Sequence, residues 1–429
     1  MNEGQNSQLS SCRLPSLMSE QRQTRSLELD SLEPTVWPQD FWRSMPTSLR
    51  GVLSDWFFWS IGPIVFVSRW LTMSQPYFGD ALAIIRASQN HSYVIQPPGY
   101  WLYCRIAGLF TDPGFGLGLI NALLSALGSM VFYLVCLHLT TRLAARWATA
   151  AYSVIFFAWF AGSTHSSYAG ELLFPALMLL FMVQYVENPR LPLLLGVAGS
   201  YALVGGVRPS DGMFLGLALL YFSLRYVRSW KDRIFMLGIA GALCLFWFIP
   251  QKMALAATDK PTISGQFWPL AQRSSLIVAG VSKLALSNII RVAFPLGIAF
   301  WSLLPAIFFA RESRFKLILW IWIIPGVAFF ALLYISDAPY LCFLVPAIIL
   351  LALTPRPGRL TYVGLAVCVG FNVAFFLFAR PAPVHNTRSL AVAIYSADGP
   401  HYCAWALRHQ WQHQLSNYTD VPSIGNEIK

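Results

Sequence analysis

The chain has 429 residues, of which 56% are hydrophobic, 15% are aromatic and only 11% are charged, and its formal net charge is +11. A soluble domain needs far more polar surface, so this composition excludes a soluble globular protein and indicates a chain that crosses a membrane many times. Most basic residues lie in short segments between apolar runs. The positive charge therefore indicates orientation in a membrane and not the binding of nucleic acid.

The apolar runs define the predicted architecture. Residues 1–50 are rich in Ser, Gln, Arg and Glu without an apolar period, which predicts a disordered cytoplasmic arm. A transmembrane domain is expected over residues 51–380, followed by an external tail over residues 381–429. Within that domain, eleven segments are apolar enough for transmembrane helices: about 53–72, 115–139, 144–162, 168–186, 192–207, 210–227, 234–250, 287–309, 316–335, 340–354 and 360–379. The fold class is thus an all-α polytopic membrane protein.

The distribution of Lys and Arg predicts the orientation. With the N-terminus inside, the inner loops carry twelve basic residues: Arg142, Arg146, Arg190, Arg225, Arg228, Lys231, Arg233, Arg311, Arg314, Lys316, Arg356 and Arg359. The short outer turns carry Arg208 alone. Because inner loops are enriched in positive charge, the N-terminus is expected in the cytoplasm and the C-terminus outside. The long segments 73–114 and 251–286 then face the outside as well.

Asp80 is the first candidate for catalysis. It is the one acid in the stretch from Gln75 to Tyr103, which otherwise consists largely of aromatic, amide and small residues. A carboxylate near the outer membrane surface can take a proton from an incoming hydroxyl or amine. Alternatively, Asp80 is a solvated loop acid or the N-cap of a helix over residues 81–87.

Glu171 and Arg208 are the next candidates. Glu171 opens the fourth predicted span, and an acid inside a membrane is a functional candidate by default. Arg208 follows Gly205 and Gly206 in a short turn, where its guanidinium fork suits a phosphate group. The structural alternatives are that Glu171 pairs with Arg208 or a lysine at the interface, and that Arg208 pairs with Asp211 to close the turn.

The remaining candidates are basic or metal-binding side chains in the outer segments. Residues 251–286 hold Lys252, Lys260, Arg273 and Lys283 near aromatic residues, which suits a lipid phosphate or simply an interfacial helix. In the tail, His409 and His413 would share one helix face, as a metal pair needs, but a solvated amphipathic tail also fits. The sequence contains no Walker A loop, dinucleotide fingerprint, nucleophile elbow or HExxH motif.

Several of these positions together resemble a family. The matching elements are Gly79-Asp80, Gln96-Pro97-Pro98-Gly99-Tyr100, Tyr168-Ala-Gly-Glu171, Arg208-Pro209 and Asp337-Ala-Pro-Tyr340 with Pro346. The pattern, over about residues 53–355, resembles the lipid-linked sugar transferases of the GT-C fold. It is most similar to bacterial relatives of the dolichyl-phosphate-mannose protein mannosyltransferases, which include the aminoarabinose transferases of lipid A. Many members have Asp-Glu where this chain has Asp80-Ala81, and an aspartate where it has Glu171, so a divalent metal ion is left open.

The resemblance implies an integral-membrane glycosyltransferase of the cell envelope, with its active site on the external (periplasmic) face of the inner or plasma membrane. A sugar would pass from a polyprenyl phosphate to a lipid, polysaccharide or protein acceptor with inversion. Asp80 would act as general base and Glu171 would position the acceptor or a metal ion. The donor phosphate would be bound by Arg208, Lys252, Lys260 and Arg273, and Tyr100 and Tyr340 would line the site. The alternatives are a glycolipid flippase or transporter, and a non-catalytic membrane scaffold.

Overall fold

The computed structural model describes residues 51–52, 54–73, 79–90, 100–256, 268–269, 271–273, 275–309, 315–334 and 338–378. The predicted arm over residues 1–50, the predicted tail over residues 381–429 and Lys260 lie outside these ranges. The chain divides into two units, Met1–Trp59 and Ser60–Lys429. The contacts discussed below all belong to the second unit.

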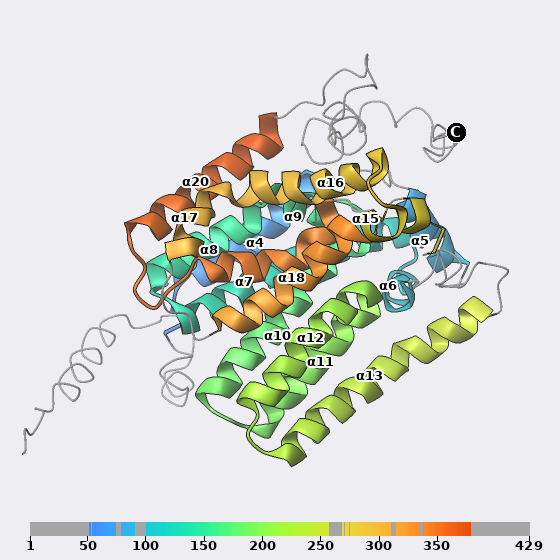
Figure 1. Cartoon of the computed structure of the whole chain (residues 1–429), viewed down its shortest axis with the longest axis horizontal. Helices are drawn as coiled ribbons and strands as arrows, with labels where there is room; N and C mark the ends of the chain where they lie inside the picture. Colours follow the sequence, from blue (N-terminus) through green and yellow to red (C-terminus); the bar gives the residue numbers. More distant parts are fainter. Residues whose placement is uncertain are drawn as a thin grey trace, which may run out of the picture. The chain divides into compact units, whose positions relative to one another are not determined.

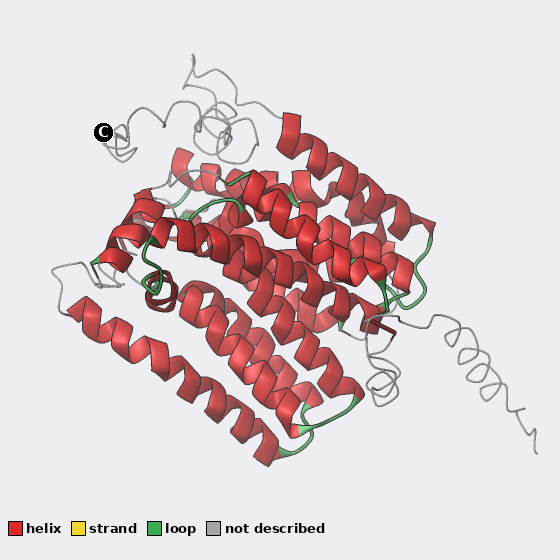
Figure 2. Cartoon of the chain, turned by 180° about the vertical axis from the view of Figure 1, so that it is seen from behind, coloured by secondary structure: helices red, strands yellow, loops and turns green. Residues whose placement is uncertain are grey.

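Every regular element in the described ranges is a helix, as Figures 1 and 2 show. The α-helices are α4 (Trp56–Leu71), α5 (Gly79–Gln89), α6 (Trp101–Ala107), α7 (Pro113–Leu139), α8 (Arg142–Val154), α9 (Phe156–Gly162), α10 (Gly170–Glu187), α11 (Leu191–Val207), α12 (Pro209–Tyr226), α13 (Trp230–Ala256), α15 (Leu276–Ala279), α16 (Lys283–Phe300), α17 (Leu304–Phe309), α18 (Lys316–Leu332), α19 (Val345–Leu351) and α20 (Arg359–Phe378). The 3₁₀ helices are η1 (Ser167–Ala169), η2 (Trp301–Leu303) and η3 (Ala338–Leu344).

The predicted fold class is confirmed. Five described helical segments are long and apolar enough to cross a membrane, or up to six if the bent pair α8 and α9 is one span. The five are Pro113–Leu139, Ser167–Glu187, Trp230–Ala256, Asn288–Phe309 and Arg359–Phe378. The protein is therefore an α-helical integral membrane protein, whereas the number of eleven spans stays a prediction.

The bundle forms because long helices pack in succession. α10 packs against α7 and α11, and α11 in turn contacts α12 and α13, which run together in green to yellow-green in Figure 1. α7 and α10 approach closely at Gly128, where a Cβ atom would lie only 2.8 Å from the Leu172 carbonyl oxygen. A small residue at this point lets the two backbones meet, as is usual between membrane helices. This contact fixes the beginning of α10.

The segment predicted as one span over residues 144–162 is broken into α8 and α9, which meet at 64°. Side chains from other helices bind the backbone groups that the break frees. The Arg69 guanidinium donates to the Ser153 carbonyl, and the Phe156 N–H donates to Asn372 Oδ1 at 3.2 Å. Unsatisfied backbone groups are costly in a membrane, so these partners allow the break. Neither Gly nor Pro marks it in the sequence, which is why the pattern predicted a continuous helix.

The span predicted at 340–354 also differs, because its first part is the 3₁₀ helix η3 and only Val345–Leu351 is α-helical. Trp322 Nε1 of α18 donates to the Phe343 carbonyl at 3.0 Å and so holds η3. The N–H of Phe343 donates to a carboxylate from another element. This turn therefore contributes a backbone donor to the polar centre of the bundle.

Candidate active site

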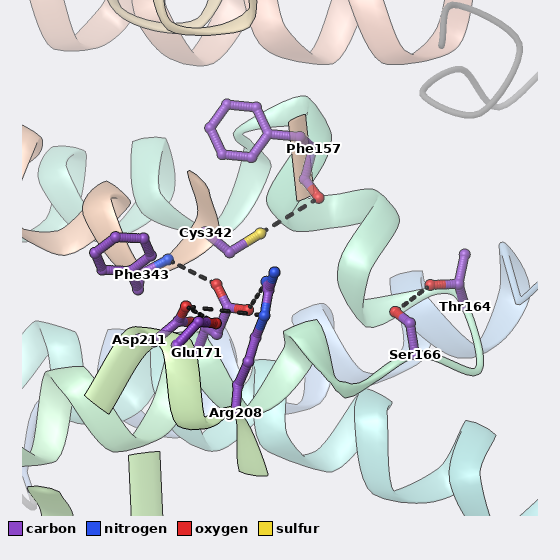
Figure 3. A network of polar contacts seen from close by, with 9 residues as sticks. Phe157, Thr164, Ser166, Glu171, Arg208, Asp211, Cys342 and Phe343 are labelled. Atoms are coloured by element: carbon purple, nitrogen blue, oxygen red, sulfur yellow. Dashed lines mark hydrogen bonds and ion pairs between the residues drawn. The ribbon is translucent and has the colours of Figure 1, made fainter. Parts of the chain in front are cut away.

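A cluster of three charged side chains lies buried where three helices meet (Figure 3). Glu171 is in the first turn of α10, Arg208 links α11 to α12, and Asp211 is in the first turn of α12. Arg208 Nη1 lies 2.5 Å from Glu171 Oε1, and Arg208 Nε lies 3.8 Å from Asp211 Oδ1. The three residues are only 2%, 5% and 0% exposed, respectively. Buried charges persist only when they are paired, and this network supplies the pairing.

The local sequence explains why the acids and the arginine meet. Pro209 occupies the first position of α12, so the helix begins directly after Arg208. α11 and α12 can pack tightly here because Gly212 faces Gly205, where a Cβ atom would lie 2.9 Å from the Gly205 Cα. The two carboxylates sit in the first turns of their helices, where the helix dipole favours negative charge. Both acids thus have a local reason for their position in addition to the arginine.

Two tyrosine rings enclose the arginine. The Arg208 Cζ atom lies 4.6 Å from the ring centroid of Tyr168 and 4.3 Å from that of Tyr340. Cation–π attraction of this kind is strongest away from water. The second carboxylate oxygen of Glu171 accepts the Phe343 N–H at 3.0 Å. Both oxygens of Glu171 are therefore occupied, and η3 is tied to α10 through it.

Four of the predicted site residues come together here. Glu171, Arg208 and Tyr340 are in direct contact, and Tyr100, at the N-terminus of α6, is near enough to interact electrostatically with Arg208. The ion pairs kept as structural alternatives, Glu171–Arg208 and Arg208–Asp211, are both formed. The charge on the guanidinium is thus balanced within the protein, and its binding of a donor phosphate stays a prediction.

The other predicted site residues either lie apart from this cluster or are only partly described by the structure. Asp80 lies in the first turn of α5, and its side chain is outside the described part of the structure. Lys252 and Arg273 are exposed, and neither forms a hydrogen bond or ion pair with Glu171, Arg208 or Asp211 within the ranges that the structure describes. Their roles in phosphate binding, like that of Lys260, stay predictions.

A hydrophobic contact connects the Asp80 helix with the cluster. Ile84 and Ala87 of α5 pack with Tyr100 and Tyr103 of α6, and the same core includes Val207, the residue before Arg208. α5 thus packs on α6, and α6 in turn packs on α11, the helix that precedes Arg208. The backbone of Asp80 belongs to α5, so its position relative to α6 is set by packing.

A buried polar turn that the sequence analysis did not single out supports the start of α10. Asn121 Nδ2 of α7 donates to the carbonyl oxygens of Thr164 and Ser166 at 2.5 and 2.8 Å. The Tyr103 hydroxyl lies 2.7 Å from the Ser166 carbonyl oxygen and 2.8 Å from Asn121 Oδ1. The Thr164 and Ser166 hydroxyls lie 3.0 Å apart (Figure 3). An asparagine within the apolar run of α7 is the one sequence signal for this network.

His165 occupies the same turn in a different electrostatic state. It is 6% exposed, and burial lowers the pKa of its imidazole to about 4, although Asp112 opposes that shift. The imidazole is therefore neutral at pH 7. Its Nδ1 atom has no hydrogen-bond partner among the described residues. The turn therefore buries a neutral basic side chain, whereas the neighbouring cluster buries Arg208 together with acidic partners.

The described residues contain no group of three or more His, Cys, Asp or Glu side chains that could hold a metal ion. Glu171 and Asp211 are joined to Arg208, which occupies the position that a cation would take between them. The predicted histidine pair, His409 and His413, lies outside the described ranges. The divalent ion that the sequence analysis left open, with Glu171 positioning the acceptor or the ion, is not tested by this arrangement.

Comparison with known proteins is informative at the level of the fold. No protein-family model matches the sequence, and no curated protein matches it. Among solved structures, ArnT from Cupriavidus metallidurans bound to undecaprenyl phosphate superposes with a TM-score of 0.51 at 18% identity, over 72% of this chain and 60% of that one. The apo structure of the same protein gives a TM-score of 0.49 at 15% identity, over 71% and 59% of the two chains. This chain thus spans about 60% of the length of ArnT. It shares its fold with that membrane protein, which confirms at the level of the fold the resemblance found in the sequence.

Proposed function

We propose that this protein is an integral-membrane glycosyltransferase that moves a sugar from a polyprenyl phosphate to an acceptor at the external membrane face. The observation that carries the proposal is the gathering of Tyr100, Glu171 and Tyr340 around Arg208. These residues come from four segments, and the family resemblance selected each of them separately. The fold likeness to ArnT, which was crystallised with undecaprenyl phosphate, supports a lipid phosphate as part of the donor.

In the proposed reaction, an acceptor hydroxyl attacks the anomeric carbon of the donor sugar. The bond from that carbon to the phosphate oxygen breaks, and the configuration is inverted by one direct displacement. Asp80 takes the hydroxyl proton, because a carboxylate close to the acceptor can serve as general base. The polyprenyl phosphate leaves with the bonding electrons, and positive side chains stabilise its growing charge.

The charges in the structure bear on the role of each basic residue. Two carboxylates already balance the charge of Arg208. The rings of Tyr168 and Tyr340 hold its guanidinium in one orientation, so the cation is preorganised. We assign the outer contacts with the donor phosphate to Lys252, Lys260 and Arg273, and a contact closer to the sugar to Arg208. Glu171 then acts by positioning Arg208 and η3 beside the acceptor.

The test is a transfer assay in membranes with radiolabelled polyprenyl-phosphate sugars, scoring label in protein, lipid and polysaccharide fractions. Asp80→Asn should reduce transfer by about 10²–10⁴-fold, the usual contribution of a general base. Asp232→Asn is the matched control, because Asp232 is also an aspartate in the first turn of a helix, partly exposed on α13 and outside the cluster around Arg208. Transfer that persists in Asp80→Asn, at equal protein abundance, would remove the assignment.

A glycolipid flippase is the second candidate, and the broken span of α8 and α9 favours it, because discontinuous helices are typical of transporters. Liposomes containing the purified protein and a fluorescent polyprenyl-phosphate sugar would distinguish the two. Movement of the lipid between leaflets without any transfer would support the flippase. Transfer that depends on Asp80 would support the enzyme.

A further inference from the structure

A second arginine is buried in the bundle at a site that the function proposed above does not use. Arg69 lies in the last turn of α4 and is 2% exposed. Its guanidinium donates to the Ser153 carbonyl and, at 3.2 Å, to Ser68 Oγ. The Cζ atom lies 4.6 Å from the ring centroid of Trp159. The side chain therefore reaches from α4 across to the break between α8 and α9.

The charge of Arg69 is only partly balanced. No carboxylate forms an ion pair with it in the part of the chain that the structure describes. An arginine stays protonated in proteins, so the charge cannot be removed as it can from a histidine. The C-terminal end of α8 offers only about half an elementary negative charge. A substantial positive charge thus remains in an environment of low dielectric constant.

Arg69 also has a hydrogen-bond donor to spare. Its Nε atom is buried without an acceptor among the described residues. Gly162 leaves the space in which this part of the side chain lies, since a Cβ atom there would come within 2.9 Å of Arg69 Cδ and 3.0 Å of Nε. An orphan donor next to an unbalanced charge is the arrangement that an anion would complete.

Hydroxyl groups near the same helix end form a polar network beside Arg69, in which Thr72 Oγ1 donates to the Ser68 carbonyl at 2.7 Å. The Thr72 and Ser163 hydroxyls lie 2.7 Å apart, and Trp159 Nε1 donates to Thr72 Oγ1 at 3.0 Å. Thr72, Ser68 and Trp159 are partly exposed, so this polar strip reaches the protein surface beside Arg69. A guanidinium with a spare N–H, next to a polar strip, suits the oxygens of a phosphate or phosphodiester.

We propose that Arg69 is the charged centre of an anion-binding site for a phosphate or phosphodiester group at the end of α4. The group would be supplied by a lipid headgroup or by free phosphate, and it would accept from Nε of Arg69, beside the polar side chains of Ser68 and Thr72. The proposal does not depend on sugar transfer. Its failure and the failure of the transferase assignment are measured separately.

The experiment measures the thermal unfolding of the full chain, purified in a neutral detergent, with added ligand. Sodium phosphate is compared with sodium chloride of the same ionic strength, and dioctanoyl phosphatidylglycerol is compared with uncharged dioctanoylglycerol. A ligand that binds the folded state raises the melting temperature. A shift with phosphate identifies the free anion as sufficient, and a shift with phosphatidylglycerol alone identifies the lipid headgroup.

Variants then locate the site. Arg69→Gln should abolish the shift and weaken binding by more than about tenfold, because a buried charge partner is lost. Arg86→Gln, which removes an exposed arginine of α5, should keep the shift. A wild-type protein that neither phosphate compound stabilises would show that Arg69 only caps α8. A shift that survives in Arg69→Gln would equally overturn the proposal.

Gly162→Ala tests the same point if Arg69→Gln does not fold. The added methyl group would overlap Ser125 Oγ and lie 2.9 Å from Arg69 Cδ, so both side chains would have to move while the charge of Arg69 is retained. Gly199→Ala is the control, because a Cβ atom at Gly199 meets nothing within 4 Å. Loss of the ligand-induced shift in Gly162→Ala, but not in Gly199→Ala, supports the site. Retention of the shift in both variants contradicts it.

Discussion

The two buried arginines, Arg208 and Arg69, are accommodated in opposite ways. Arg208 has two carboxylates and two tyrosine rings around it, whereas Arg69 has a carbonyl, a hydroxyl and one tryptophan ring. Burying an ion is expensive unless opposite charge and hydrogen bonds replace water. Arg208, whose charge and hydrogen bonds are satisfied within the protein, is thus held as a fixed internal cation. Arg69, whose charge is balanced only in part, can still accept an anionic ligand as a further partner.

Secondary structure accounts for this difference. Arg208 lies at the start of α12, and the acids that hold it occupy the first turns of α10 and α12, where negative charge is favoured. Arg69 instead contacts the C-terminal end of α8. The last carbonyl groups of that helix have no donor within the helix, and they carry only a partial negative charge. Helix beginnings therefore supply full charges to one arginine, and a helix end supplies a partial charge to the other.

The largest expected effect follows from removing the balanced arginine. Arg208→Met should lower the free energy of unfolding by about 3–5 kcal/mol, because Glu171 and Asp211 would remain buried without their cation. SDS-induced unfolding in mixed micelles measures the change. A triple variant that also carries Glu171→Gln and Asp211→Asn should recover part of the loss. A single variant as stable as the wild type would refute the assigned charge balance.

Removing the partly balanced arginine should cost less. Arg69→Met should lower the free energy of unfolding by about 1–3 kcal/mol, the cost of leaving the buried Ser153 carbonyl without its donor. No carboxylate is stranded in this case. The same SDS titration gives the value. A loss equal to or larger than that of Arg208→Met would reverse the order that the comparison predicts.

His165 shows a third way to bury a basic group, and its expected effect is the smallest. Its folded-state pKa is about 4 against an ordinary 6.5, so the unfolded chain binds the additional proton between these values. Stability should therefore decrease as the pH falls through this window, by less than about 1 kcal/mol between pH 7 and pH 6. Unfolding measured at both pH values should show a smaller change in His165→Gln. An unchanged pH dependence in that variant would contradict the assignment.

The sequence singled out most members of the buried cluster around Arg208, because these polar residues stand at the ends of apolar runs. Glu171, Arg208 and Tyr340 each border a predicted span, and the predicted orientation groups their segments on one side of a membrane. Asp211 was considered only as a local partner of Arg208, since its proximity to Glu171 depends on how α10 and α12 pack. Long-range packing of this kind leaves no periodic signal.

The break at Ile155 and the role of Arg69 were not predictable for the same reason. Residues that bind the freed backbone groups, Arg69 and Asn372, are far from the break in sequence. The apolar period continues through Ile155, so it indicated one helix. The 3₁₀ form of η3 likewise depends on Trp322 and on the carboxylate of Glu171. Tertiary contacts decided these details.

The placement of α6 has a consequence for how a substrate enters. Tyr103 and Ala107 of this helix are almost completely buried, and the Tyr103 hydroxyl bonds to the turn before α10. Swinging α6 outward would expose these side chains and separate Tyr100 from the neighbourhood of Arg208. α6 is therefore a fixed wall of the site and not a hinged lid. Under the proposed function, a gate for the lipid-linked donor would then have to be formed by other parts of the chain.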